Sequence, residues 1–146
     1  MGPQIVGKGR RDKPQADARS GNARRRGPRP ATPERLKKAA LAYLERYAAP
    51  AAQVRRVLLR RVKRSAELHG TDPEAGAGAV DALVARLVAE GLIDDRAYAE
   101  SKARGLSRRG ASARRIAAQL AAKGVAGEDR ALALAGIAAQ PGEPEL

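Results

Sequence analysis

The near absence of aromatic side chains is the feature that most constrains the fold of this chain. Its 146 residues include no Phe, no Trp and only three Tyr. Large aromatic residues supply much of the buried area in broad protein cores. The apolar residues here are mostly Ala, Leu and Val, which suit short helices packed closely together. We therefore expect a small helical protein, either one domain or a short array of helical repeats, of ordinary to modest stability.

Apolar residues recur at helical spacing in six segments, each bounded by helix start and stop signals. Thr32, Asp72 and Ser112 are good N-cap residues, Asp94 or Asp95 caps the fourth helix, and Gly91 suits the position after a helix. No segment with a period of two stands out, so the predicted fold class is all-α. The predicted helices lie near residues 33–48, 51–66, 73–91, 95–109, 112–123 and 127–139.

The first and third predicted helices have the clearest apolar stripes, which we expect to face the core. The first stripe consists of Leu36, Ala39, Ala40, Tyr43, Leu44 and Tyr47, and the third of Val80, Leu83, Val84, Leu87 and Val88.

Positive charge is concentrated at the N-terminal end of the chain. The net charge is +13, and residues 1–32 hold nine basic and two acidic side chains. These residues are rich in Gly, Pro and Arg and lack apolar periodicity, so we expect a disordered basic tail. Such an excess of charge implies attraction to polyanions such as nucleic acids, through neutralisation of phosphates.

The composition excludes several classes of protein. Without Cys, the chain has no disulfide, no thiolate nucleophile and no Cys-based metal site. No apolar run approaches the roughly 20 residues that span a bilayer, and no apolar segment follows the N-terminal basic residues as in a secretory signal. We expect a cytoplasmic, monomeric protein with no membrane association, no metal and no cofactor.

An internal repeat relates the second and fifth predicted helices. A shift of 62 residues places Pro50 on Ser112, Val54 on Ile116, Leu58 on Leu120 and Arg61 on Lys123. In both copies a helix start is followed by apolar residues at helical spacing and then by a basic residue. The interpretation is two three-helix repeats, with these boundaries: tail 1–32, first repeat 33–93, second repeat 94–140 and C-terminal tail 141–146.

Two groups of basic residues are the main candidates for binding a partner. We expect them to lack carboxylates at i,i+4 spacing, so that like charges accumulate on a helix face and lower stability unless an anionic partner binds. The alternative is a merely solvated face. The first group is Arg55, Arg56, Arg60, Arg61, Lys63 and Arg64, and the second is Arg104, Arg108, Arg109, Arg114 and Arg115.

Catalytic interpretations are weak. Asp94 and Asp95 are adjacent on a helix, so capping is favoured over a paired-carboxylate or magnesium site. The run Gly105–Ser112 has two glycines at phosphate-loop spacing but lacks the lysine and the preceding strand, so a break or hinge between helices is favoured. His69 precedes Gly70 at a predicted helix end, which suits a cation better than a catalytic base.

Two tyrosines are candidates for stacking on nucleic-acid bases. Tyr43 and Tyr98 lie on apolar stripes, which favours core packing over base stacking.

The segment Glu90–Ala99, with the sequence EGLIDDRAYA, combines a helix stop, a short apolar staple, a carboxylate cap and an aromatic residue one turn later. This run resembles the signature that joins consecutive three-helix repeats in the RecX family. The signature residues here are Gly91, Leu92, Asp94, Asp95 and Tyr98. Weaker similarity covers residues 36–136, with Pro50 where the family tends to have Ser. Family members usually have three repeats, whereas this sequence ends after about two.

The resemblance implies a non-catalytic modulator that binds in the helical groove of RecA assembled on single-stranded DNA, within DNA repair, recombination and the SOS response. Such a protein would suppress filament growth, strand exchange and the associated ATP hydrolysis. Two alternatives stay open. The first is a helix-turn-helix transcriptional regulator, although no recognition helix suited to base edges is evident. The second is an enzyme acting on nucleic acid, which would need a metal cluster or a nucleophile that the sequence does not offer.

Overall fold

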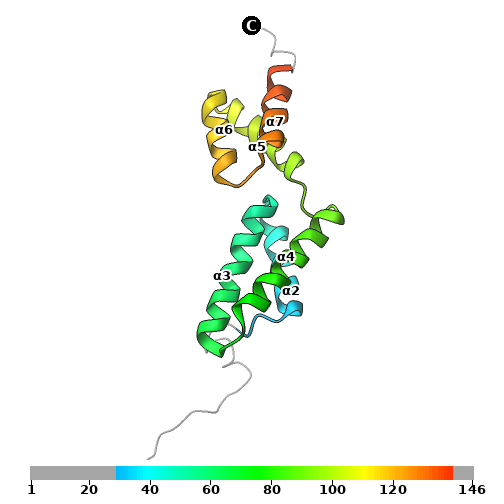
Figure 1. Ribbon diagram of the computed structural model, residues 1–146. Helices are drawn as coiled ribbons and strands as arrows, with labels where there is room; N and C mark the ends of the chain where they lie inside the picture. The colour runs from blue at the N-terminus through cyan, green and yellow to red at the C-terminus, as the bar shows by residue number, and fades with distance from the viewer. Residues whose placement is uncertain (1–28, 140–146) are drawn as a thin grey trace, which may run out of the picture. The chain divides into compact units, whose positions relative to one another are not determined.

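The computed structural model describes residues 29–139, and within this range residues 31–139 belong to one structural unit. Within residues 29–139 the regular structure is entirely helical, so the predicted all-α fold class is confirmed. Apart from residues 29–32, the predicted N-terminal tail lies outside the described residues, as does the C-terminal tail. The helices are α2 (Pro33–Arg46), α3 (Ala51–His69), α4 (Pro73–Ala89), α5 (Asp95–Arg108), α6 (Ala113–Ala122) and α7 (Gly127–Ala139) (Figure 1).

Short polar side chains set where most of these helices begin. In four of them an N-cap oxygen accepts a backbone N–H two or three residues further on, which satisfies a donor that the helix itself leaves free. Helix α3 differs, because the residue before it is Pro50, which makes no side-chain cap hydrogen bond. The four N-cap residues are Thr32 for α2, Asp72 for α4, Asp94 for α5 and Ser112 for α6.

Glycine in the left-handed region ends α4 as the sequence predicts. Gly91 has φ 81°, and the Leu92 N–H donates to the Leu87 carbonyl at 2.9 Å while the Gly91 N–H donates to the Val88 carbonyl at 3.0 Å. This pair of hydrogen bonds is the Schellman motif, in which a side chain at the glycine position would be strained. Glycines in the same region also follow α3, α5 and α6.

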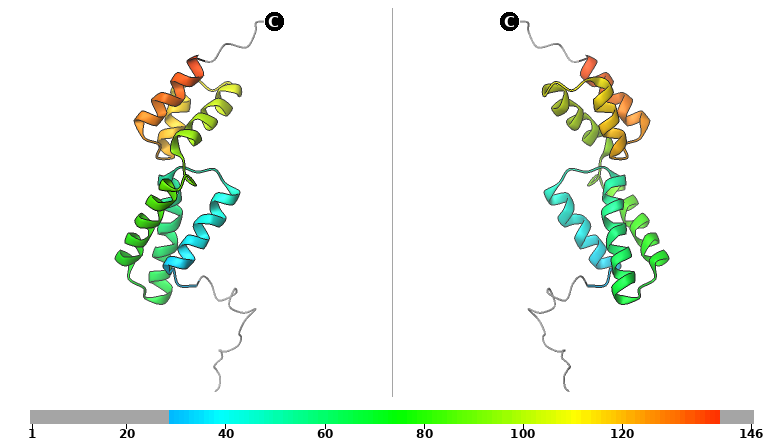
Figure 2. Two further views of the ribbon diagram at one scale, coloured as in Figure 1. Left: turned by 90° about the vertical axis from the view of Figure 1, so that its right-hand side faces the viewer. Right: turned by 90° about the vertical axis from the view of Figure 1, so that its left-hand side faces the viewer.

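The buried apolar residues form two separate clusters, one within α2–α4 and the loop after α4, the other within α5–α7. Figure 2 shows the three helices of each group packed side by side. Neither cluster contains a fully buried aromatic ring, as the composition led us to expect. The first is built around Leu36, Val54, Leu58, Val62, Val80, Leu83, Val84, Leu87 and Ile93, and the second around Ala99, Ala103, Leu106, Ile116, Leu120, Val125 and Ala133.

Helices α3 and α6 occupy corresponding positions in the two groups. Pro50 and Ser112 are their N-cap residues. The residues four and eight positions later, Val54 and Leu58 in α3 and Ile116 and Leu120 in α6, are all buried. These are the positions that the 62-residue shift superimposes. Division of the chain into two repeats at residue 94 stays a prediction.

Two residues assigned to the apolar stripes are exposed, and for these the prediction was wrong. Tyr47 is 51% exposed because α2 ends at Arg46 and Tyr47 adopts extended backbone, where helical spacing no longer applies. Val88 is 47% exposed. It lies one position beyond Leu87, about 100° further around α4, and so falls at the edge of the stripe that contacts the core.

One buried polar side chain ties the beginning of the folded unit to the loop between α3 and α4. Ser65 is 1% exposed; its Oγ accepts the Ala31 N–H at 3.0 Å and shares a 2.8 Å hydrogen bond with Thr71 Oγ1. A buried hydroxyl needs such partners because it has lost its hydrogen bonds to water.

Three contacts join the beginning of α3 to the second group of helices. The Ala51 N–H donates to Asp95 Oδ1 at 2.8 Å. An Arg56 guanidinium N–H donates to the Lys123 carbonyl at 3.4 Å. Gly124, with φ +88°, comes so close to Ala52 that a Cβ at Gly124 would clash with the Ala52 Cβ. Glycine is therefore required at position 124 both by its backbone conformation and by this close approach.

Candidate partner interface

The outer face of α3 carries a continuous strip of positive charge. Arg60, Lys63 and Arg64 are exposed, and their spacing of three and four residues places them together on one face of the helix. The stripe Val54, Leu58 and Val62 is buried on the opposite side. Arg56 is also exposed and extends the strip by one turn. We call Arg56, Arg60, Lys63 and Arg64 the α3 basic face.

The expectation that these basic groups lack carboxylates at i,i+4 spacing was wrong, and one of the arginines also pairs with a carboxylate on another helix. Arg55 Nε lies 2.7 Å from Asp81 Oδ1 on α4, in an exposed ion pair. Glu67 follows Lys63 by four residues, although no ion pair joins them within residues 29–139. Glu100 precedes Arg104 by four residues, but its Oε2 lies 3.4 Å from Arg96 Nε instead.

Once Arg55 is set aside, the α3 basic face still has an excess of positive charge. Over the described residues, no ion pair involves Arg60, Lys63 or Arg64. Arg61 is exposed on the flank of the same helix. Like charges at i,i+4 spacing destabilise an isolated helix by a few tenths of a kcal/mol, ~0.2–0.5 per pair. An anionic partner would remove this penalty.

A second basic group lies where α5 ends and α6 begins. Arg104 and Arg108 are in α5, Arg109 is its C-cap, and Arg114 and Arg115 lie in the first turn of α6. All are exposed. Cations in the first turn oppose the partial positive charge of a helix N-terminus, and α6 has no acidic residue there to compensate. We call these five residues the α5–α6 arginine cluster.

The signature segment runs from the C-cap of α4 into the beginning of α5. Gly91 ends α4, and Asp94 Oδ1 accepts the Ala97 N–H at 3.0 Å at the start of α5. The apolar pair that follows Gly91 is divided: Ile93 is 2% exposed and joins the first core cluster, whereas Leu92 is 53% exposed. The interpretation of the pair as one apolar staple therefore holds for Ile93 and is wrong for Leu92.

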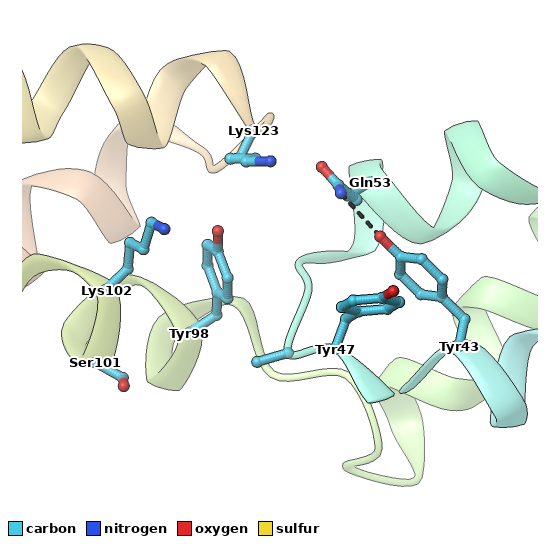
Figure 3. Close-up of a pocket in the computed structure, with 8 residues that line it drawn as sticks. Tyr43, Tyr47, Gln53, Tyr98, Ser101, Lys102 and Lys123 are labelled. Atoms are coloured by element: carbon cyan, nitrogen blue, oxygen red, sulfur yellow. Dashed lines mark hydrogen bonds between the residues drawn. The ribbon is translucent and has the colours of Figure 1, made fainter. Parts of the chain in front are cut away.

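Tyr98, the last signature residue, packs against the second core cluster and also lines a pocket of about 300 Å³. In Figure 3 the Tyr98 ring stands on one side of an open space and the Tyr43 and Tyr47 rings on the other. Gln53 and Lys123 border the same space. The complete lining is Tyr43, Tyr47, Ala48, Gln53, Tyr98, Ser101, Lys102 and Lys123. We call it the tyrosine pocket.

Contacts among the pocket residues hold two of the rings in place. The Tyr43 and Tyr47 ring centroids are 5.0 Å apart at an interplanar angle of 44°, and the Gln53 amide donates to the Tyr43 hydroxyl at 2.9 Å. The Arg46 guanidinium lies over the Tyr47 ring, 5.8 Å from its centroid. Partial burial, and secondarily the nearby Tyr43 phenol, raise the pKa of the Tyr98 phenol above its usual 10.0. Tyr98 is therefore a neutral hydrogen-bond donor at physiological pH.

The expected packing of Tyr43 and Tyr98 is observed, since both are partly buried against a core cluster. Their meeting with Tyr47 in one pocket was not predicted. The sequence spacing indicates only part of this arrangement. Tyr43 and Tyr47 are four residues apart, as are Tyr98 and Lys102, so each pair is expected on one side of its helix. The two pairs come together because the beginning of α5 lies near the beginning of α3, where Asp95 accepts the Ala51 N–H. No local pattern encodes this proximity.

The segments considered for catalysis have ordinary structural surroundings. Gly105 is inside α5 and Gly110 ends it with φ 93°, so this run is a helix break. His69 is the last residue of α3. Across residues 29–139, no group of three or more His, Cys, Asp or Glu side chains could hold a metal ion. None of the helices in this part of the chain combines the length and apolar character that a membrane crossing requires.

Comparison with known proteins gives two matches. The family model described as "RecX, second three-helix domain" matches residues 94–134, from the N-cap of α5 into α7. A curated relative named "Regulatory protein RecX", from Myxococcus xanthus (strain DK1622), is 50% identical over 101 residues, which are 69% of this chain and 54% of the relative. The chain thus spans about half the length of that relative. No solved structure was found to match.

Proposed function

The chain belongs to the RecX family, and from this premise we propose that it is a non-catalytic regulator of RecA filaments on single-stranded DNA. It binds the filament and inhibits recombinase activity together with the associated ATP hydrolysis. The observation that carries this proposal is the α3 basic face, an exposed strip of cations on the side of α3 opposite its buried stripe.

The electrostatics favour a DNA-containing partner. Cations that bind phosphates release condensed counterions, so binding becomes stronger and salt-dependent. A net charge of +13 also steers the protein toward a polyanion. In this proposal the α3 basic face and the α5–α6 arginine cluster contact DNA phosphates or acidic filament surface. The nine basic residues of the N-terminal segment add salt-sensitive affinity.

The test is RecA ATP hydrolysis on single-stranded DNA, titrated with the full chain at moderate salt. The test variant changes Arg60, Lys63 and Arg64 to Ala, which removes three exposed charges and no ion pair within the described part of the chain. We expect its half-inhibitory concentration to rise about tenfold or more. Three lost phosphate contacts should also lower the slope of log affinity against log salt by about 2, at ~0.7 per single-strand contact.

The matched control changes Lys37, Lys38 and Arg86 to Ala. These residues are also exposed, on α2 and α4, and the net charge falls by the same amount. We expect the control to inhibit nearly as well as the natural chain. Equal losses in both variants would mean that net charge alone acts, and would contradict an interface on α3. No inhibition by the natural chain, with equal binding to naked duplex DNA, would favour the helix-turn-helix transcriptional regulator instead.

A further inference from the structure

We propose that the tyrosine pocket binds one unstacked nucleotide of single-stranded DNA, with the base against the tyrosine rings and a backbone phosphate near Lys102 and Lys123. The inference deepens the proposed function, on which it rests for the identity of the nucleic acid. It adds a specific site to the general attraction of the basic faces.

The distribution of aromatic rings is the first observation. All three aromatic residues of the chain line this pocket, although they come from α2, the residue after it, and α5. Neither core cluster uses them as buried members, and Tyr47 leaves 51% of its surface exposed. The exposed Tyr47 ring, with Tyr43 beside it and Tyr98 across the space, offers a flat apolar surface to a base. Base stacking on aromatic side chains accepts any sequence.

The charge around the rings is the second observation. Lys102 and Lys123 are partly buried pocket residues, and neither ammonium group has an ion pair within residues 29–139. No lining residue is acidic. Arg56 is held close by its hydrogen bond to the Lys123 carbonyl. The pocket therefore suits an anion that also has a flat face, which describes a nucleotide better than an acidic or an aliphatic side chain.

Size and polar groups agree with this ligand. At about 300 Å³ the pocket is at the small end of the ~300–1,000 Å³ range of small-molecule sites, which suits one nucleotide and excludes a duplex. The Gln53 amide and the Tyr98 phenol border the space (Figure 3). They can form hydrogen bonds with base edges or with the sugar.

The experiment measures binding of the full chain, without RecA, to two fluorescein-labelled oligonucleotides of equal length and charge. One is oligo-dT and the other is an abasic strand of the same number of phosphates. Contributions of the basic tail and basic faces are common to both, so the ratio of the two dissociation constants isolates base recognition. We expect the natural chain to prefer oligo-dT by about fivefold to a hundredfold, the effect of stacking one base.

Tyr47→Ala tests the ring, and Tyr47→Phe is its matched control. Because Tyr47 is half-exposed and lies outside the core clusters, neither change should unfold the chain. We expect Tyr47→Ala to bring the preference for oligo-dT close to one, and Tyr47→Phe to retain it. Lys102→Gln with Lys123→Gln should weaken binding to both strands and lower the salt slope, relative to Lys37→Gln with Lys38→Gln.

Equal affinity of the natural chain for oligo-dT and the abasic strand would overturn the pocket proposal. So would loss of RecA inhibition in Tyr47→Ala with an unchanged oligo-dT preference, which would assign the pocket to a protein side chain of the filament. In that case the proposed function survives. Conversely, the natural chain could prefer oligo-dT in a way that depends on Tyr47 and yet leave RecA ATP hydrolysis unchanged. This result would support the pocket proposal and contradict the proposed function.

Discussion

The Asp95 carboxylate accepts a hydrogen bond from the Ala51 N–H at 2.8 Å, across 44 positions of sequence. Ala51 is the first residue of α3, and Pro50 before it supplies no side-chain cap. Asp95 therefore provides to α3 the acceptor that Ser112 provides to α6. A carboxylate at a helix N-terminus is also favoured by the helix dipole. One side chain thus both caps α3 and fixes α5 against it.

Removal of this acceptor should destabilise the fold. We expect Asp95→Ala to lower the free energy of unfolding by about 1 kcal/mol, within the ~0.5–2 kcal/mol range of lost N-caps. Asp95→Asn keeps an oxygen acceptor and should lose less. Urea unfolding followed by circular dichroism measures both. Equal stability of the two variants would show that the charge, and not the hydrogen bond to Ala51, accounts for the effect of Asp95.

The local features of the fold were predictable, because each depends on residues a few positions apart. The caps at Thr32, Asp72 and Ser112 bond to N–H groups two or three residues later. At Asp94–Asp95 the sequence left two candidates for the cap, and the structure selects Asp94. The family signature could likewise be recognised in the sequence, because the end of one helix and the beginning of the next lie within ten residues.

Features that depend on tertiary packing were not predictable. The hydrogen bonds of Asp95 to Ala51 and of Ser65 to Ala31 join residues 44 and 34 positions apart. The helical periodicity of a sequence carries no information about contacts over such distances along the chain. Tyr47 was misassigned because the end of α2 decides whether helical spacing applies to it. The tyrosine pocket arises only because the beginning of α5 lies near the beginning of α3.

Two glycines in α4 should respond oppositely to the same substitution. A Cβ at Gly76 would lie 2.6 Å from Val62 Cγ1, whereas a Cβ at Gly78 would meet nothing within 4 Å. Gly78→Ala should stabilise the chain by ~0.5–1 kcal/mol, because Ala has the higher helix propensity. Gly76→Ala should lose this gain and destabilise by about 1–3 kcal/mol through overpacking. Thermal unfolding of the two variants measures the difference; similar midpoints would contradict the close packing of α4 on α3.

Ser65 should be sensitive to loss of its hydroxyl. Its Oγ is the acceptor for the Ala31 N–H and the partner of Thr71 Oγ1. In Ser65→Ala both groups lose their partner, and a buried unsatisfied polar group costs about 1–3 kcal/mol. Ser101→Ala is the matched control, because Ser101 is exposed on α5 and should change stability by less than ~0.5 kcal/mol. Equal effects in urea unfolding would contradict a structural role for Ser65.

Stability should fall at alkaline pH in a way that depends on Tyr98. The folded-state pKa of this phenol is raised above 10.0, first by burial and then by Tyr43, so the folded chain holds its proton more tightly than the unfolded chain does. The resulting stabilisation is fully present below pH 10 and is lost as the pH rises through the folded-state pKa.

The variant Tyr98→Phe lacks the phenol proton and serves as the comparison for this effect. Urea unfolding at intervals from about pH 9 to 11 should therefore give a steeper loss of stability in the natural chain than in Tyr98→Phe, with Lys and Arg titration common to both. Parallel curves would show that Tyr98 is as accessible to water in the folded chain as in the unfolded one, and would contradict its packing against the second core cluster.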